Sequence, residues 1–114
     1  MTRRYSVDWL ESARRELFQI VDDLARQPPA AAVATLDLVE EKARSLETLP
    51  DRGRLIPELT VFSNRSYREL QIPPHCLLYR IDADKILVLG LFDSRRNLEE
   101  VILERVFRYL HDDA

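Results

Sequence analysis

Two adjacent arginines, Arg95 and Arg96, follow a strongly apolar run and stand directly before a predicted helix. The start of a helix exposes backbone N–H groups and the positive end of the helix dipole, which repels a guanidinium group. A phosphate or a partner's carboxylate would be attracted by both the arginines and the N–H groups. The pair therefore predicts an anion-binding site. The alternative is local ion pairing with Asp93, Glu99 and Glu100.

Arg68 and Arg80 lie on two neighbouring predicted strands, and we expect them to extend this positively charged patch. The alternative is a solvated sheet face on which these arginines pair with Glu69 and Asp82. The patch would bind a target protein or an anion.

Arg52 and Arg54 flank Gly53 in the segment that joins the two halves of the chain. A glycine between basic residues loosely resembles a loop that cradles phosphate. A turn with solvated charges is the simpler interpretation.

Only His75 and His111 carry side chains whose ordinary pKa lies near neutrality. These two histidines are therefore the candidate acid and base groups for any proton-transfer chemistry.

Composition excludes several classes of protein. The chain has 114 residues, of which 46% are hydrophobic and 32% charged, as expected for one domain covering residues 1–114 rather than a disordered or membrane protein. No apolar run could cross a bilayer and no secretory signal is visible, so we expect a cytoplasmic protein. The net charge of −3 argues against a protein that coats nucleic acid.

The single cysteine, Cys76, can form neither an internal disulfide nor a multi-cysteine metal site. It could be a nucleophile, but no base is fixed beside it, and a packed thiol is the simpler interpretation. We expect no metal and no cofactor.

Apolar periodicity predicts an α+β fold: an N-terminal strand and a helical hairpin packed on a small antiparallel sheet, with a C-terminal helix. Asp8 and Glu11 have the spacing of a capping box that would begin the first helix. The expected elements are a strand at Tyr5–Val7, a helix at Trp9–Arg26, a second helix between "QPPA" and Pro50, a short strand near Leu59–Phe62, strands at Tyr67–Ile72, His75–Ile81 and Ile86–Leu91, and a helix from Asn97. Turns are expected at Pro73–Pro74 and Asp82–Lys85.

Several motifs, in their order along nearly the whole chain, resemble the RelE/ParE superfamily of toxins from type II toxin–antitoxin systems, the plasmid-stabilisation type. They are "YSVDWLESARREL", "LPDRGRLIPEL", "YREL", "LLYRID" and "ILVLGLFDSRRN". The resemblance implies a growth-inhibiting toxin that a cognate antitoxin neutralises by wrapping around it. It allows for oligomers with the antitoxin.

The superfamily divides by target. RelE-like members resemble ribosome-dependent ribonucleases that cut mRNA without a metal, whereas ParE-like members act on DNA gyrase. By position, Arg68 and Arg95 or Arg96 match basic residues of the ribonucleases. If the chain is a ribonuclease, the resemblance implies that these arginines are catalytic, and His75 would supply the acid or base that cleavage by the RNA 2′-OH requires. Leu70 and Cys76 stand where further basic residues are expected, while Asp93 and Asn97 replace basic or aromatic groups.

These departures favour a ParE-like toxin that binds a protein such as gyrase. A ribosome-dependent mRNA endoribonuclease and an inactive binding module of the same fold remain the alternatives.

Overall fold

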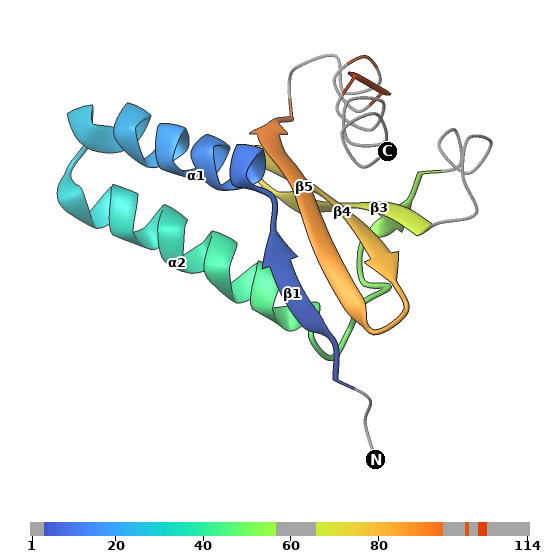
Figure 1. The fold of residues 1–114 in the computed structure, drawn as a ribbon. Coiled ribbons are helices and arrows are strands. Elements are labelled where there is room, and N and C mark those ends of the chain that lie inside the picture. Colours follow the sequence, from blue (N-terminus) through green and yellow to red (C-terminus); the bar gives the residue numbers. More distant parts are fainter. Residues whose placement is uncertain (1–3, 57–65, 95–99, 101–102, 105–114) are drawn as a thin grey trace.

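The computed structural model describes residues 4–56, 66–94, 100, 103 and 104. Its elements, in chain order, are β1 (Ser6–Trp9), α1 (Glu11–Asp23), the 3-10 turn η1 (Leu24–Arg26), α2 (Pro29–Ser45), β2 (Arg54–Leu55), β3 (Ser66–Ile72), β4 (His75–Asp82) and β5 (Lys85–Asp93). Figure 1 shows α1 and α2 as a hairpin beside the sheet. This arrangement confirms the expected α+β fold class.

The five strands form one sheet in the order β1-β5-β4-β3-β2. The β2–β3, β3–β4 and β4–β5 pairs are antiparallel, as expected. The N-terminal strand β1 joins the same sheet and pairs in parallel with β5, with Val7 opposite Ile86. The sheet is therefore mostly antiparallel, with β1 at one edge and β2 at the other.

The first helix begins later than the capping-box spacing predicts. Its N-cap is Leu10, and no side chain caps it, so the prediction that Asp8 begins the helix is wrong. The reason is strand pairing, because β1 continues to Trp9 opposite Val88 and the Leu10 N–H donates to the Val88 carbonyl at 3.0 Å. Residues that complete a ladder with β5 cannot adopt helical dihedral angles at the same time.

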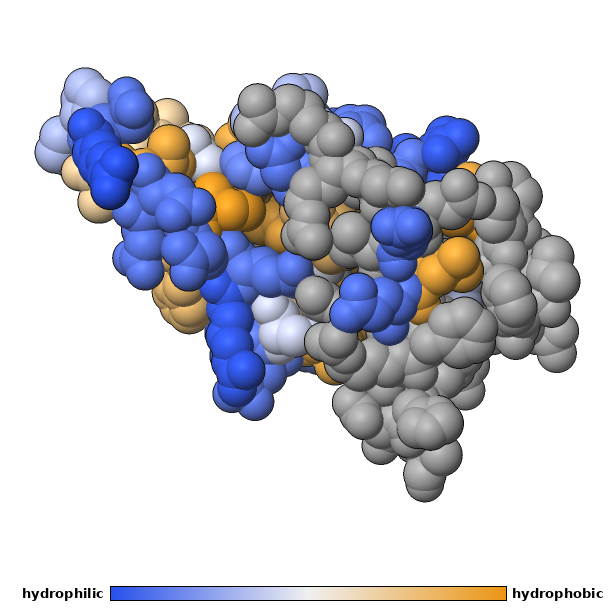
Figure 2. Space-filling view, turned by 90° about the horizontal axis from the view of Figure 1, so that it is seen from above, coloured by the Kyte–Doolittle hydropathy of each residue, from blue (hydrophilic) through white to orange (hydrophobic). Residues whose placement is uncertain are grey.

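The helical hairpin has the predicted break at the two prolines. Pro29 occupies the first turn of α2, where its missing N–H costs nothing, and α2 ends at Ser45, before Pro50. Figure 2 shows that hydrophilic side chains dominate the visible surface of the hairpin. No helix within the described part of the chain is long and apolar enough to span a membrane.

The sheet is buried on both faces. On the face that the helices cover, called the helix face, the strand side chains Leu70, Ile72, Leu77, Tyr79, Ile86, Val88 and Leu91 pack with Ala13, Leu17, Val39, Ala43 and Leu46. On the opposite face, Tyr67, Leu78, Leu89 and Phe92 pack with Ile56 and with Leu103. Apolar burial on both sides explains why Ile86–Leu91 is hydrophobic without alternation.

Two expected segments fall largely outside the described residues. The short strand near Leu59–Phe62 is one of them, whereas β2 lies just before it in a segment without a sequence signal. The helix expected from Asn97 is the other, although Glu100, Leu103 and Glu104 are helical. The predicted turns at Pro73–Pro74 and Asp82–Lys85 are both present.

A loop of Pro50–Gly53, called the 50–53 loop, is fastened to the sheet by Tyr79. The buried Tyr79 hydroxyl donates to the Pro50 carbonyl at 2.6 Å and accepts from the Gly53 N–H at 2.9 Å. A Cβ atom on Gly53 would meet the Glu69 carbonyl oxygen at 2.7 Å and the Tyr79 ring and hydroxyl at 2.8 Å. Only glycine allows the loop to approach the strands this closely.

We predict that Gly53→Ala lowers the free energy of unfolding by about 1–3 kcal/mol, because the added methyl overpacks against backbone that cannot move away. Tyr79→Phe should also destabilise, by about 1–3 kcal/mol, because it leaves the buried Gly53 N–H unpaired. Denaturant titration of both single variants and the double variant measures this. The double variant should lose less stability than the sum, since the changes affect one contact; strict additivity would contradict this packing.

Candidate functional site

The arginine pair that opened the sequence analysis, Arg95 and Arg96, lies outside the described residues. Its point of departure is described: β5 ends at Asp93, and Ser94 donates its N–H and its hydroxyl to the Pro74 carbonyl at 2.9 and 2.8 Å. The segment therefore leaves the sheet beside the turn between β3 and β4. The anion-binding role of the pair stays a prediction.

Arg68 and Arg80 do not form one surface. Arg68 lies opposite Tyr79 in the register, whereas Arg80 lies opposite Tyr67. Directly opposed residues share a face of a sheet and neighbouring residues along a strand point to opposite faces. Arg68 is therefore on the helix face with Tyr79, and Arg80 is on the opposite face with Tyr67. The expectation of a shared patch is not met.

Arg80 is buried, with 2% of its surface exposed. Its Nε and Nη2 atoms donate to Asp82 Oδ2 at 2.9 and 2.5 Å, and its guanidinium carbon lies 5.9 Å from the centre of the Tyr67 ring. A buried charge requires this kind of pairing because transferring an ion from water to the protein interior costs on the order of several kcal/mol. The alternative interpretation, pairing with Asp82, is the one found, although in the core rather than on a solvated surface.

Arg68 contacts backbone oxygens. Its Nη1 atom donates to the Gly53 carbonyl at 2.8 Å and to the Asp51 carbonyl at 3.2 Å. Together with Tyr79 it fastens the 50–53 loop to β3 and β4. Its side chain is half-buried, so Arg68 acts here as a support for the loop.

His75 is half-buried at the start of β4, directly opposite Asp93. Burial lowers the pKa of His75 below its ordinary value, and the charge of Asp93 opposes that change. His75 is separated from Arg68 by four residues along the β3–β4 ladder, which is about 13 Å at ~3.3 Å per residue. The two residues expected to share a ribonuclease site are thus far apart.

Cys76 and Glu69 lie together on the opposite face. The Glu69 carboxylate is 7% exposed and binds Arg54 through Nε and Nη2, at 2.9 and 2.7 Å. The Cys76 thiol donates to Glu69 Oε2 at 3.6 Å. Burial, followed by the Glu69 charge, raises the pKa of Cys76 to about 12. A thiol held protonated in this way is a packed group rather than a nucleophile.

Within the described ranges, no group of three or more His, Cys, Asp and Glu side chains is placed to hold a metal ion.

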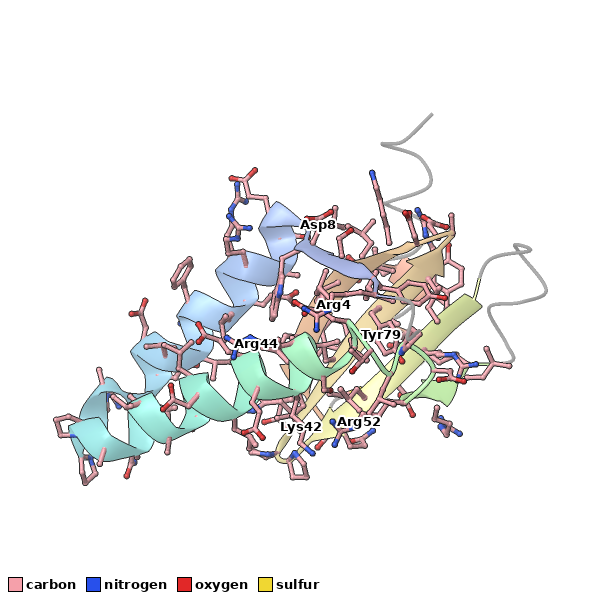
Figure 3. All side chains as sticks on the ribbon, turned by 90° about the horizontal axis from the view of Figure 1, so that it is seen from below. Arg4, Asp8, Lys42, Arg44, Arg52 and Tyr79 are labelled. Atoms are coloured by element: carbon pink, nitrogen blue, oxygen red, sulfur yellow. The ribbon has the colours of Figure 1, made fainter. Side chains whose placement is uncertain are left out.

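A groove between β1, α1 and α2 has no counterpart in the sequence analysis. It encloses about 390 Å³ and is lined by Val7, Trp9, Arg14, Leu17, Phe18, Leu36, Glu40, Ala43, Arg44 and Glu47. Phe18 is 60% exposed, and Arg44 lies between the two helices in Figure 3. One sequence signal could have indicated the groove. Phe18 directly follows the core residue Leu17, so it lies off the apolar stripe of α1, where an exposed side chain is expected.

The high pKa of Cys76 predicts a loss of stability at high pH. The unfolded thiol ionises near pH ~8.5, whereas the folded thiol ionises at about 12. As pH rises between these values the unfolded chain loses a proton that the folded chain keeps, so the folded state is destabilised. Between pH 8 and 10.5 the free energy of unfolding should fall by about 2–3 kcal/mol more in the wild type than in Cys76→Ala. Parallel pH curves would contradict this.

The fold matches known toxin structures. The chromosomal ParDE toxin–antitoxin system from P. aeruginosa is similar with a TM-score of 0.64 and 19% identity, over 80% of this chain and 97% of that chain. The RelBE2 toxin–antitoxin complex from Mycobacterium tuberculosis is similar with a TM-score of 0.54 and 24% identity, over 82% and 94%. At these identities the similarity is one of fold. No curated protein sequence matches the chain significantly.

Residues 7–98 match the family model described as the ParE toxin of the type II toxin–antitoxin system, parDE. The match spans most of the chain, from β1 to the segment that follows β5. It agrees with the fold and with the motifs of the sequence. The chain belongs to the ParE toxin family of type II toxin–antitoxin systems.

Proposed function

We propose that this chain is a cytoplasmic toxin that arrests growth by binding a protein target, DNA gyrase, and that a cognate antitoxin neutralises it. The observation that carries the proposal is the pairing of the cations on the opposite face of the sheet. Arg54 is bound to Glu69 and Arg80 to Asp82. A phosphate group would have to displace a carboxylate from each guanidinium before it could bind there.

Cys76 on that face and His75 on the helix face also favour binding over RNA cleavage. By sequence resemblance, the ribonucleases of the superfamily carry a basic residue at the position of Cys76. The Cys76 thiol cannot replace that charge, because it stays protonated at neutral pH. His75 is on a different part of the sheet from Arg68. Losing one transition-state donor typically costs about 100- to 1000-fold in rate. A cleavage site without these groups would be slow.

The alternative, a ribosome-dependent mRNA endoribonuclease, is favoured by one observation. His75 faces Asp93 across β4 and β5, and the chain continues from Asp93 towards Arg95 and Arg96. A histidine beside a carboxylate can act as an acid or a base in RNA cleavage. A third possibility, an inactive binding module, predicts no growth defect.

The partner of the groove between β1, α1 and α2 follows from its shape and polarity. β1 is an edge strand. Its Ser6 N–H donates to the Asp84 carbonyl just before β5, and the Leu10 N–H just after β1 donates to Val88, so the N–H groups of Val7 and Trp9 point away from β5. An extended segment that adds to this edge can place apolar side chains in the groove. We propose that a segment of the antitoxin occupies it.

Phe18→Asp should weaken antitoxin binding by about 30-fold or more, because a charge on the groove wall removes an aromatic anchor. Val33→Asp is the matched control, since Val33 is similarly exposed but does not line the groove. Calorimetric titration of each variant with the antitoxin measures the effect. Equal affinities for the two variants would contradict the assignment of the groove.

The target is tested with purified toxin freed of antitoxin. We expect it to inhibit DNA supercoiling by gyrase, and the antitoxin should reverse the inhibition. Translating ribosomes with mRNA are the parallel assay, in which the message should stay intact. Cleavage of the message together with normal supercoiling would instead assign the ribonuclease function, and His75→Ala should then slow cleavage by about 100-fold or more.

A further inference from the structure

The segment Leu49–Leu55, called the 49–55 corner, is largely exposed and includes β2, at the edge of the sheet far from β1. It leads from α2 into β2, which is the edge strand opposite β1 in the sheet order. Leu49 and Leu55 are 54% and 40% exposed, and Asp51, Arg52 and Arg54 are also exposed. The corner therefore presents leucine and arginine side chains together, and arginine is among the residues enriched at protein interfaces.

The corner is held rigidly from beneath. Tyr79 and Arg68 contribute two hydrogen bonds each to backbone atoms of the 50–53 loop. From outside, Arg52 Nη1 donates to Ser45 Oγ at 2.7 Å, and that hydroxyl donates to the Lys42 carbonyl. Figure 3 shows Lys42 and Arg52 near the C-terminal end of α2, with Tyr79 further towards the sheet. Such a loop binds a partner without a large loss of conformational entropy.

The charges of the corner are unbalanced. Among the described residues, neither Arg52 nor Arg68 forms an ion pair with a carboxylate. Arg54 is neutralised by Glu69, so the exposed carboxylate left to oppose these two arginines within the segment is Asp51. Counted together with Arg68, which contacts its backbone, the corner carries one positive charge in excess, in a chain whose net charge is −3. A partner would complement it with carboxylate groups.

The backbone of the corner is not arranged to cradle phosphate. The Arg52 N–H donates to the Leu49 carbonyl at 3.1 Å, and the Gly53 N–H donates to Tyr79. A phosphate-binding loop needs several N–H groups directed at the ligand. Two exposed leucines beside the arginines likewise fit an acidic protein surface better than a nucleic acid backbone.

We propose that the 49–55 corner is the surface by which the toxin docks onto an acidic face of its folded target protein. This inference rests on the proposed toxin function but not on gyrase being the target. A rigid loop with exposed leucine and arginine side chains suits the surface of a folded protein, whereas a groove beside an edge strand suits an extended segment. The two kinds of partner are thus assigned to the two edges of the sheet, the antitoxin to β1 and the target to the corner.

The test uses the full chain expressed in bacteria, with growth arrest as a readout that does not depend on which target is hit. Arg52→Glu and Leu55→Ser should each raise the amount of toxin needed for arrest by about tenfold or more, as expected for central interface residues. Arg26→Glu, the same charge change on exposed η1, should arrest growth like the wild type. Thermal unfolding and antitoxin affinity should stay close to wild type in all three variants.

Two results would overturn the inference while the toxin function stands: full arrest by Arg52→Glu, or a loss of antitoxin affinity in Arg52→Glu that parallels its loss of arrest. The same holds if the wild type binds duplex DNA and Arg52→Glu does not, since the corner would then serve nucleic acid. Absence of arrest by the wild-type chain would overturn the proposed function and this inference together.

Discussion

Burial of the central strands on both faces determines what each charged side chain on them can do. Arg80 lies in the opposite-face core with 2% of its surface exposed, so its charge must be neutralised where it stands, and Asp82 does so. Glu69, on the same face, is neutralised by Arg54. The desolvation of an unpaired charge at either position would cost on the order of several kcal/mol. Residues that look like binding groups in the sequence are therefore used to satisfy one another.

Because the central strands are buried on both faces, the described strand surfaces that remain accessible to partner proteins lie at the edges of the sheet. On the helix face, Arg68 supports the 50–53 loop through backbone oxygens and so presents Arg52 rather than a site of its own. At the other edge, the apolar groove beside β1 is open because α1 and α2 cover the helix face without covering the edge strand. The interior of the sheet thus provides a rigid frame, and the described surfaces suited to partners lie at its two borders.

Sequence patterns predicted the fold well because alternation, prolines and turn residues act locally. They failed where pairing between strands determines the structure. Asp8 does not cap α1, because it lies within β1 and pairs with β5. Arg68 and Arg80 were assigned to one patch, although a two-residue turn at Pro73–Pro74 fixes the pairing of β3 with β4 and puts Tyr79 opposite Arg68. The irregularity between Leu78 and Tyr79 in the pairing with β5 had no sequence signal.

The groove was missed, and the 49–55 corner was interpreted only as a turn with solvated charges, for a different reason: each includes apolar side chains that are exposed although their type predicts burial. The two sites lie at opposite edges of the five-stranded sheet, and four spacings of about 4.8 Å put those edges about 19 Å apart. An antitoxin segment confined to the groove would leave Arg52 and Leu55 accessible to a target. Neutralisation by steric exclusion would therefore require an antitoxin chain that continues past the edge at β1, or whose folded part shields the corner. Because Trp9 in the groove and Arg52 in the corner lie at opposite edges of the sheet, an antitoxin that blocks both sites must be long enough to reach from one edge to the other.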